Sequence, residues 1–212
     1  MIRIRDIALP PEADMAALSR AAARLLRLKE SEIRQIDVKR RSVDARKKHD
    51  VRMIYTVDVL VSGREDKVLK AARCGKAAIA QDAPYAPPAG QRALPQRPVV
   101  IGFGPAGMFA ALVLAMAGAR PIVLERGQDA RTRSEKVRKF WNGGGLDPEC
   151  NVQFGEGGAG TFSDGKLNTG TKNARIGWVL EQFADAGAGA DILYDAKPHI
   201  GTDELVEVVQ NL

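Results

Sequence analysis

The centre of the chain reads Val99-Val100-Ile101-Gly102-Phe103-Gly104-Pro105-Ala106-Gly107. Three apolar residues that favour β-structure run into a Gly-x-Gly-x-x-Gly turn, and an alanine-rich helix is expected from Met108 to about Ala117. A second short strand, from Pro121 to Leu124, then ends in Glu125. This order predicts the first β-α-β unit of a dinucleotide-binding fold.

A physical reason can be given for the residue type at each of these positions in the turn. Gly102 allows a tight turn, Gly104 lets a pyrophosphate approach the backbone, and Gly107 lets the helix lie close to the strand. Pro105 suits the first helical turn, where no N–H is needed, and Ala106 follows it. The N–H groups and the positive dipole end at the start of such a helix attract phosphate groups.

Glu125 follows Gly107 by 18 positions. A carboxylate at that strand end can accept hydrogen bonds from both hydroxyls of an adenosine ribose and would repel a 2′-phosphate, which disfavours NADP at this site. The alternative is a transmembrane helix in the uncharged span between Arg97 and Arg120. Glycines and a proline in the first half of that span favour strand, turn and helix instead.

Charge and proline content predict two domains and a linker. Residues 1–97 hold 21 Lys and Arg against 12 Asp and Glu, a net +9, whereas residues 98–212 hold 11 against 14, a net −3. We therefore predict an α/β protein with a small α+β domain over residues 1–81 and a Pro-rich linker over 82–97. Residues 98–212 are predicted to form a partial Rossmann-like dinucleotide-binding domain that is incomplete at its C-terminus.

Hydrophobic periodicity predicts the order β-α-β-β-α-β in the first domain, a ferredoxin-like arrangement. The expected elements are Met1–Leu9, Asp14–Leu28, Ile33–Val43, Arg52–Val61, Arg64–Arg73 and Ala77–Ala80. Beyond the first β-α-β unit we expect helices over Arg131–Phe140 and Ala174–Ala186, a strand over Asp191–Asp195, and a last helix capped by Thr202.

A basic segment from Lys39 to His49 joins two of the predicted strands. Such a cluster suits nucleic acid, an anionic ligand, a contact with acidic groups of the same protein, or simply a solvated hairpin. It lacks the interleaved aromatic residues on which bases stack, so nucleic acid is not the expected partner.

Two glycine clusters, 143–145 and 155–160, follow the basic helix 131–140. The basic residues of that helix can face phosphates or water. The second cluster continues to Leu167 and offers backbone N–H groups and close approach to a flat or phosphorylated ligand. A flexible surface loop is the alternative, although Phe154 and Phe162 would be unusual in one.

The chain has two cysteines, Cys74 and Cys150, without a Cys-x-x-Cys motif. Neither a redox-active disulfide nor a zinc site is expected, and no metal site is predicted. Charges at Arg3, Arg5 and Asp6 interrupt any early apolar run, so no signal peptide is expected. The expected setting is the cytoplasm, with no membrane association.

Longer motifs resemble a family of FAD-dependent dehydrogenases within the glutathione-reductase-like flavoprotein superfamily, which are NAD(P)- and FAD-dependent oxidoreductases. The similar stretches are Arg41–Lys48, the glycine turn with Glu125-Arg126-Gly127, Phe140-Trp141, Asn151–Leu167 and Pro198–Thr202. The resemblance covers the whole chain. Members of that family are longer, so it implies an N-terminal part whose partner is the remaining C-terminal part. Cys150 stands where the family is expected to have a small polar residue.

The resemblance implies an FAD-dependent enzyme in which the flavin carries the redox chemistry, with NAD(P)H as a candidate electron donor and an unknown small-molecule substrate. The residues expected to bind the cofactor are Gly102, Gly104, Pro105, Ala106, Gly107, Glu125, Arg126, Gly157, Gly158, Gly160, Thr161, Ser163, Asp164 and Lys166. The catalytic residues stay unassigned, with Glu156, Asp164, Lys166 and His199 as the polar side chains to consider. Two alternatives remain open: an NAD-binding domain without flavin, and an RNA-binding flavoprotein that uses the basic first domain.

Overall fold

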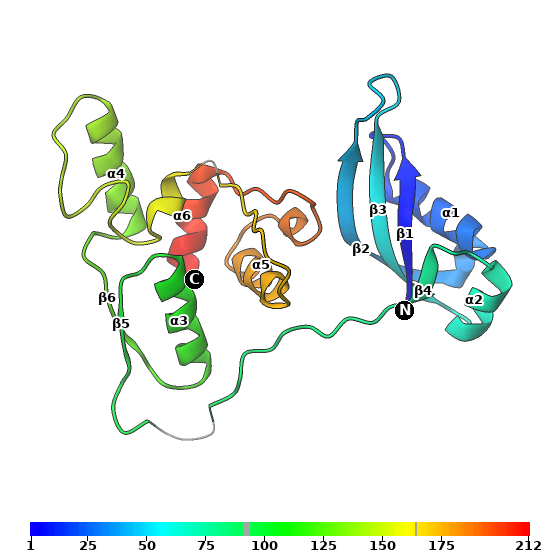
Figure 1. Ribbon diagram of the computed structural model, residues 1–212, viewed down its shortest axis with the longest axis horizontal. Helices are drawn as coiled ribbons and strands as arrows, with labels where there is room; N and C mark the ends of the chain where they lie inside the picture. The colour runs from blue at the N-terminus through cyan, green and yellow to red at the C-terminus, as the bar shows by residue number, and fades with distance from the viewer. Residues whose placement is uncertain (91–93, 164) are drawn as a thin grey trace. The chain divides into compact units, whose positions relative to one another are not determined.

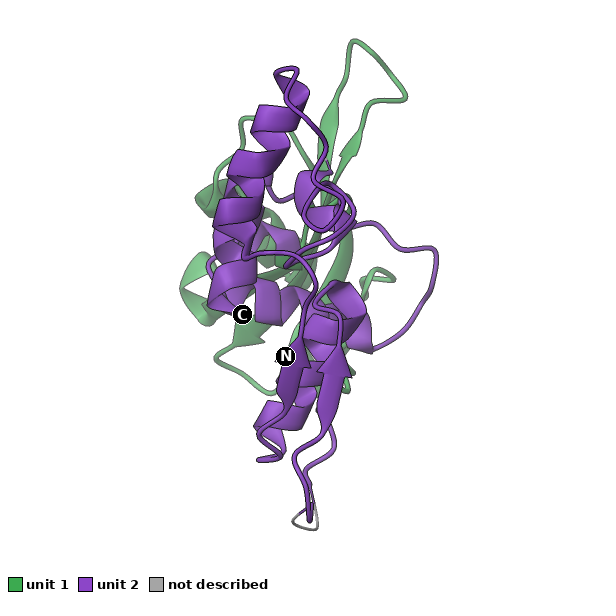
Figure 2. Cartoon of the chain, turned by 90° about the vertical axis from the view of Figure 1, so that its left-hand side faces the viewer, with its two compact units in different colours: residues 1–83, 193–198 green, residues 84–192, 199–212 purple. Residues whose placement is uncertain are grey.

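The computed structural model of the chain describes residues 1–90, 94–163 and 165–212 (Figure 1). The chain divides into two compact units, which Figure 2 colours separately. Unit 1 consists of Met1–Ala83 and Leu193–Pro198, and unit 2 consists of Pro84–Ile192 and His199–Leu212. The division near residue 83 lies at the start of the Pro-rich segment, but the assignment of Leu193–Pro198 to unit 1 was not expected from the sequence.

Unit 1 is a four-stranded antiparallel sheet with two helices. Its elements are β1 (Ile2–Leu9), α1 (Met15–Leu26), the 3₁₀ turn η1 (Glu30–Glu32), β2 (Ile33–Asp44), β3 (Arg52–Val61), α2 (Glu65–Ala72) and β4 (Ala77–Ile79). The strand order is β2-β3-β1-β4. The sequence prediction of the order β-α-β-β-α-β is confirmed, because apolar residues at every second position, such as Val57, Val59 and Val61 in β3, mark strands of this unit.

One hydrophobic core holds the sheet of unit 1 to both helices. Ile2 and Ile4 of β1 pack with Leu18 of α1 and with Ala72 of α2, so the two helices share one face of the sheet (Figure 1). Helix α1 starts where predicted, since the Asp14 carboxylate accepts a hydrogen bond from the N–H of Ala17 at 2.7 Å.

The segment Leu193–Pro198 lies against the edge of β2. Arg41 donates its N–H to the carbonyl of Tyr194 at 2.7 Å, and Ala196 donates to the carbonyl of Arg41 at 2.9 Å. The prediction of a strand over Asp191–Asp195 is wrong: the 3₁₀ turn η3 (Ala190–Leu193) occupies most of that range. Ile192 is buried among the helices of unit 2, and its N–H closes a turn onto Gly189, which an extended strand would not allow.

The described residues of unit 2 form a short parallel pair of strands and four helices. Its elements are β5 (Val99–Ile101), α3 (Pro105–Met116), β6 (Ile122–Leu124), α4 (Ala130–Trp141), the 3₁₀ turn η2 (Ala159–Phe162), α5 (Arg175–Asp185), most of η3, and α6 (Thr202–Asn211). Strands β5 and β6 are parallel, with Val99 opposite Ile122 and Ile101 opposite Leu124, and α3 connects them (Figure 1). The predicted β-α-β unit is therefore present.

The core of unit 2 joins α3, α5 and α6. Met108 packs with Phe183 of α5 and with Leu205 and Val208 of α6. The prediction that Thr202 caps α6 is wrong: Gly201 is the N-cap, Thr202 is the first helical residue, and its hydroxyl donates to the carbonyl of Ser163 at 3.0 Å.

The uncharged central span does not form one long helix. It is divided among β5, the glycine turn and α3, which has 12 residues. Within the described parts of the chain, none of the helices combines the length and the apolar character needed to cross a bilayer.

Candidate functional site

The turn between β5 and α3 has the geometry expected of a phosphate-binding loop. Gly102 has a φ of +89°, a conformation that glycine adopts without strain, and its N–H donates to the carbonyl of Leu124 at 2.7 Å. Gly104 is the N-cap of α3 and Pro105 is its first residue. A Cβ on Gly107 would lie 2.0 Å from the carbonyl oxygen of Gly102, so glycine is required for the close approach of helix and strand.

The N-termini of α3 and α4 differ in what caps them. At α4, the Asp129 carboxylate accepts from the N–H groups of Arg131 and Thr132 at 3.1 and 3.0 Å, and Glu156 accepts from Ala130 at 2.7 Å. The N-terminus of α3 has no capping hydrogen bond from a side chain of the described residues. The first N–H groups of α3 therefore lack the protein carboxylates that neutralise those of α4.

The Glu125 side chain accepts hydrogen bonds both from the glycine turn and from the residues that follow β6. Its carboxylate accepts from the N–H of Phe103 at 2.6 Å and from the N–H of Gly127 at 3.0 Å. Burial alone would raise the pKa of Glu125, but hydrogen bonds from the backbone of Gly127, Phe103, Gly155 and Arg126 outweigh it and hold the pKa below its ordinary value of 4.5. The side chain is therefore a carboxylate at neutral pH.

The glycine-rich segment 155–160 packs onto the turn. Gly157 donates its N–H to the carbonyl of Phe103 at 2.8 Å. A Cβ on Gly158 would lie 3.0 Å from the Cα of Gly104 and 3.2 Å from the Cδ of Pro105, so the two loops touch through their backbones. Gly155 and Gly157 are buried, which makes this part of the segment a packed loop rather than a flexible surface one.

Arg133 of α4 holds the same segment from the other side. It is fully buried, and its guanidinium donates to five backbone carbonyls, those of Asn151, Val152, Gly155, Glu156 and Gly158, at 2.6 to 3.3 Å. The expectation that the basic residues of this helix face phosphates or water is wrong for Arg133. The sequence carries no signal for this role, because Arg133 looks like its exposed neighbours in a basic helix.

Arg126 stands at the rim of the site over an aromatic ring. Its guanidinium carbon lies 3.6 Å from the centre of the Phe154 ring, and its Nε lies 3.8 Å from a carboxylate oxygen of Glu149. The cation–π contact orients an otherwise flexible side chain beside Glu125.

These elements enclose a groove of about 300 Å³. Its lining includes five sequence-predicted residues, Gly102, Gly104, Glu125, Arg126 and Gly158. It also includes Gln153, Phe154 and Gly155, which the sequence analysis did not assign as cofactor-binding. Pro105, Ala106 and Gly107 form the adjoining start of α3.

The remaining predicted residues that the structure describes do not line this groove. Thr161 is buried, and its hydroxyl has no hydrogen-bond partner among the described residues. The Ser163 hydroxyl donates to the carbonyl of Gly160 at 2.7 Å, and Lys166 forms an isolated antiparallel bridge with His199. Gly157 contacts Phe103 as described above, and Asp164 lies outside the described residues.

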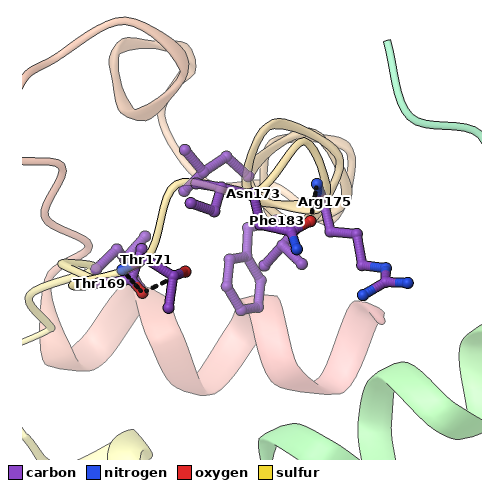
Figure 3. Close-up of a pocket in the computed structure, with 9 residues that line it drawn as sticks. Thr169, Thr171, Asn173, Arg175 and Phe183 are labelled. Carbon is purple, nitrogen blue, oxygen red and sulfur yellow. Dashed lines mark hydrogen bonds between the residues drawn. The ribbon is translucent and has the colours of Figure 1, made fainter.

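A second pocket in unit 2, of about 370 Å³, has apolar walls (Figure 3). Leu167, Ile176, Val179, Leu180 and Phe183 line it, with Thr169, Thr171, Asn173 and Arg175 at its rim. The guanidinium carbon of Arg175 lies over the Tyr85 ring, 5.5 Å from the centre of the ring. This pocket brings together none of the sequence-predicted cofactor residues.

The chemistry of the groove suits a nucleotide diphosphate. The uncapped N-terminus of α3 and the bare backbone at Gly104 suit phosphate oxygens. The Glu125 carboxylate accepts from Phe103 and Gly127, one on each oxygen, and the backbone of Gly155 and Arg126 also stabilises its charge, so a ribose hydroxyl would share this carboxylate with the backbone. The residues present therefore fit the adenosine diphosphate half of FAD or NAD.

The described residues contain no cluster of His, Cys, Asp and Glu that could hold a metal ion. Cys74 and Cys150 are both free thiols and lie in different units.

Comparisons with known proteins extend over both units. A family model described as a domain of unknown function, DUF8436, matches residues 1–60. An uncharacterized protein of Clostridium beijerinckii is 44% identical over 218 residues, an alignment that covers 100% of this chain and 40% of that protein. The chain thus spans less than half the length of this relative.

Proposed function

We propose that the chain is the nucleotide-binding part of an FAD-dependent oxidoreductase. The observation that carries the proposal is the parallel β5-α3-β6 unit, in which an uncapped helix N-terminus, a bare glycine backbone and the Glu125 carboxylate line one groove. On this proposal unit 2 is part of a larger Rossmann-like domain and unit 1 is ferredoxin-like, which its strand order β2-β3-β1-β4 supports.

Different residues of the groove would bind different parts of FAD. The N–H groups at the start of α3 would bind the pyrophosphate, and the Glu125 carboxylate would accept hydrogen bonds from the hydroxyls of the adenosine ribose. Arg126 would flank the adenosine from the rim. The flavin, when bound, supplies hydride or electron transfer, and the protein positions it and excludes water.

The length of the Clostridium beijerinckii relative supports the proposal. The relative is more than twice as long as this chain, so further strands and the walls of an isoalloxazine site would come from the remaining part of the same protein. The two unpaired cysteines fit a reducing, cytoplasmic setting.

The second candidate is an NAD-binding domain without flavin, because the turn and Glu125 suit both dinucleotides. The packed second glycine loop favours FAD, since it presents further bare backbone beside the turn. An absorbance spectrum of purified full-length protein decides between them. Flavin bands in the visible range, with about one flavin per chain after denaturation, are expected; a colourless protein that binds NAD in a titration would overturn the flavin proposal.

The RNA-binding alternative receives less support from unit 1. Three arginines of the basic hairpin region are paired with carboxylates: Arg46 with Asp44, Arg52 with Asp50, and Arg41 with Asp195. The positive charge available to a phosphate backbone is therefore smaller than the sequence suggests. Charge reversal over Lys39–Lys48 should leave flavin content unchanged, and a loss of RNA binding by that variant would favour the alternative.

A further inference from the structure

Arg133 is a buried cation without a carboxylate partner. Its side chain is 0% exposed, and no carboxylate of the described residues lies within ion-pair distance of it. Burial of an arginine is costly unless its donors are satisfied, and here backbone carbonyls satisfy them. The face of the guanidinium lies 4.7 Å from the centre of the Phe162 ring, which adds a cation–π contact.

The carbonyls that Arg133 binds come from one short segment, residues 151–158. Nε binds the carbonyl of Asn151 at 2.8 Å, Nη2 that of Val152 at 2.8 Å, and Nη1 those of Glu156 and Gly158 at 2.6 and 2.8 Å. One planar group thus fixes the direction of several peptide units whose carbonyls turn inward to it.

The fit between Arg133 and the segment is close. A Cβ on Gly155 would lie 2.5 Å from Cδ and 2.9 Å from Nε of Arg133, and Gly155 has a φ of +126°. The glycine therefore lets the backbone pass over the arginine stem. Burial lowers the pKa of Arg133 while Cys150 and Glu125 oppose that change, and an arginine stays charged at neutral pH.

The opposite side of the same segment forms part of the groove. Gly158 accepts from Arg133 and touches Gly104 and Pro105, and Gly157 donates to Phe103. Arg133 consequently lies one peptide layer behind the turn that would meet the pyrophosphate. Its charge acts on that turn through a layer of backbone that is buried at Gly155 and Gly157, and electrostatic interactions are stronger in buried surroundings than in water.

We propose that Arg133 is the positioning residue of the pyrophosphate subsite: it folds residues 151–158 onto the Gly102–Gly107 turn before a ligand binds, and it supplies a buried positive charge behind that turn. This rests on the proposed nucleotide function of the groove. On this proposal the second glycine loop forms one wall of the groove, and Arg133 holds the loop in that position.

The test compares ADP with adenosine by calorimetric titration of the full-length protein, stripped of any bound cofactor. Adenosine would occupy only the Glu125 and Arg126 end of the groove, whereas ADP also places phosphates against the turn. We expect Arg133→Met to weaken ADP by about tenfold or more and adenosine by less than about threefold, and Arg133→Lys to lie between Arg133→Met and the unmodified protein. Arg138→Met, which removes an exposed arginine of the same helix, should change neither ligand.

Equal weakening of both ligands would overturn the proposal, because a merely structural role would loosen the whole groove. Unchanged ADP affinity would also overturn it. If the unmodified protein binds neither ligand, the nucleotide function itself fails, so the two failures are distinguishable.

Hydrogen exchange of the unmodified protein tests the proposal even if the Arg133 variants do not fold. The amides of residues 151–158 should be protected before nucleotide is added and gain little when ADP binds. Exchange at unstructured rates without nucleotide, with protection only on ADP addition, would show that the ligand rather than Arg133 shapes the loop.

Discussion

At the scale of single residues, Glu125 has both a structural and a recognition role. Its carboxylate holds the backbone of Phe103 and Gly127 while it lines the groove. Glu125→Ala should weaken ADP or FAD by about 1–3 kcal/mol, because charge-assisted hydrogen bonds are lost. A flavin titration of full-length protein measures this, with Glu181→Ala of α5 as the control at an exposed carboxylate. Unchanged affinity would exclude the recognition role.

The lowered pKa of Glu125 predicts a pH dependence of stability. A carboxyl group whose pKa is lower in the folded state stabilises the fold above its unfolded pKa, near 4.5, and this contribution is lost as the pH falls through the folded value. The free energy of unfolding should therefore decrease below about pH 5, and Glu125→Gln should reduce this decrease. Denaturant titrations of both proteins at several pH values measure the difference; parallel curves would contradict the assignment.

The glycines of the turn should separate binding from folding. A Cβ on Gly104 would meet only the Cα of Gly158, at 3.7 Å, so Gly104→Val should fold, place its methyl groups in the groove and abolish FAD binding. Gly107→Ala should instead disrupt the β-α-β unit, because its Cβ would overlap the carbonyl of Gly102. Gly145→Ala, with no atom within 4 Å of the new Cβ, is the neutral control. Circular dichroism and flavin content distinguish the three, and a flavin-replete Gly104→Val protein would contradict a phosphate role for the turn.

The sequence could predict the glycine turn and the place of Glu125 after β6, because both follow from backbone geometry at fixed spacing. Arg133 could not be predicted. Its role depends on a segment some 20 residues later folding back over α4, and no local pattern distinguishes it from Arg131 or Arg138. Lys166 and Ser163 were predicted in the cofactor site from the resemblance alone, and neither lines the groove.

At the scale of elements, unit 1 was the more predictable part. Its three long strands span eight to twelve residues, and apolar residues recur at every second position in parts of them, as at Val57, Val59 and Val61, so their pattern is long enough to identify them. The range Asp191–Asp195 offered only three apolar residues in a row. Such a run does not distinguish a strand from a buried turn. In the structure the packing of Ile192 in the core of unit 2 stabilises the turn.

Arg41 ties the segment Leu193–Pro198 to the edge of β2. Its guanidinium donates to Asp195 at 2.6 and 2.8 Å and lies over the Tyr194 ring at 5.0 Å. The Asp195 hydrogen bonds also raise the pKa of Arg41, although burial opposes this. Because the pair covers an otherwise unpaired strand edge, it protects backbone groups of β2.

Arg41→Lys should loosen this segment. Lysine cannot form the bidentate pair, so the Ala196 amide should exchange about two- to fivefold faster, as expected for a part-exposed ion pair worth up to about 1 kcal/mol. Asp195→Asn should act in the same direction. Arg46→Lys, in an exposed pair with Asp44, is the matched control and should leave Ala196 unchanged. Equal exchange in all variants would show that the backbone hydrogen bonds alone hold the segment.

At the scale of the whole molecule, the two units differ in how completely their sheets are covered. Unit 1 packs four strands against two helices around one core. The described residues of unit 2 contain only two strands of three residues, and Ile101 is 86% exposed, Val99 55% and Leu124 54%. Strands of a parallel sheet are normally buried on both faces, so these apolar residues lack the neighbours that a complete Rossmann-like domain would supply.

Residues 1–212 expressed alone are therefore expected not to hold FAD stoichiometrically. The adenosine half could dock at Gly102–Gly107 and Glu125, but the isoalloxazine would lack most of its walls, and the open edges of β5 and β6 would favour aggregation. The test measures flavin per chain and the elution volume on size exclusion for this fragment and for the full-length protein, with thermal unfolding to show that unit 1 keeps its own transition. A monomeric fragment with nearly one flavin per chain would contradict the prediction. It would also mean that β5, β6 and the loop held by Arg133 capture the cofactor without further strands, so that the exposed apolar residues of the sheet serve another contact.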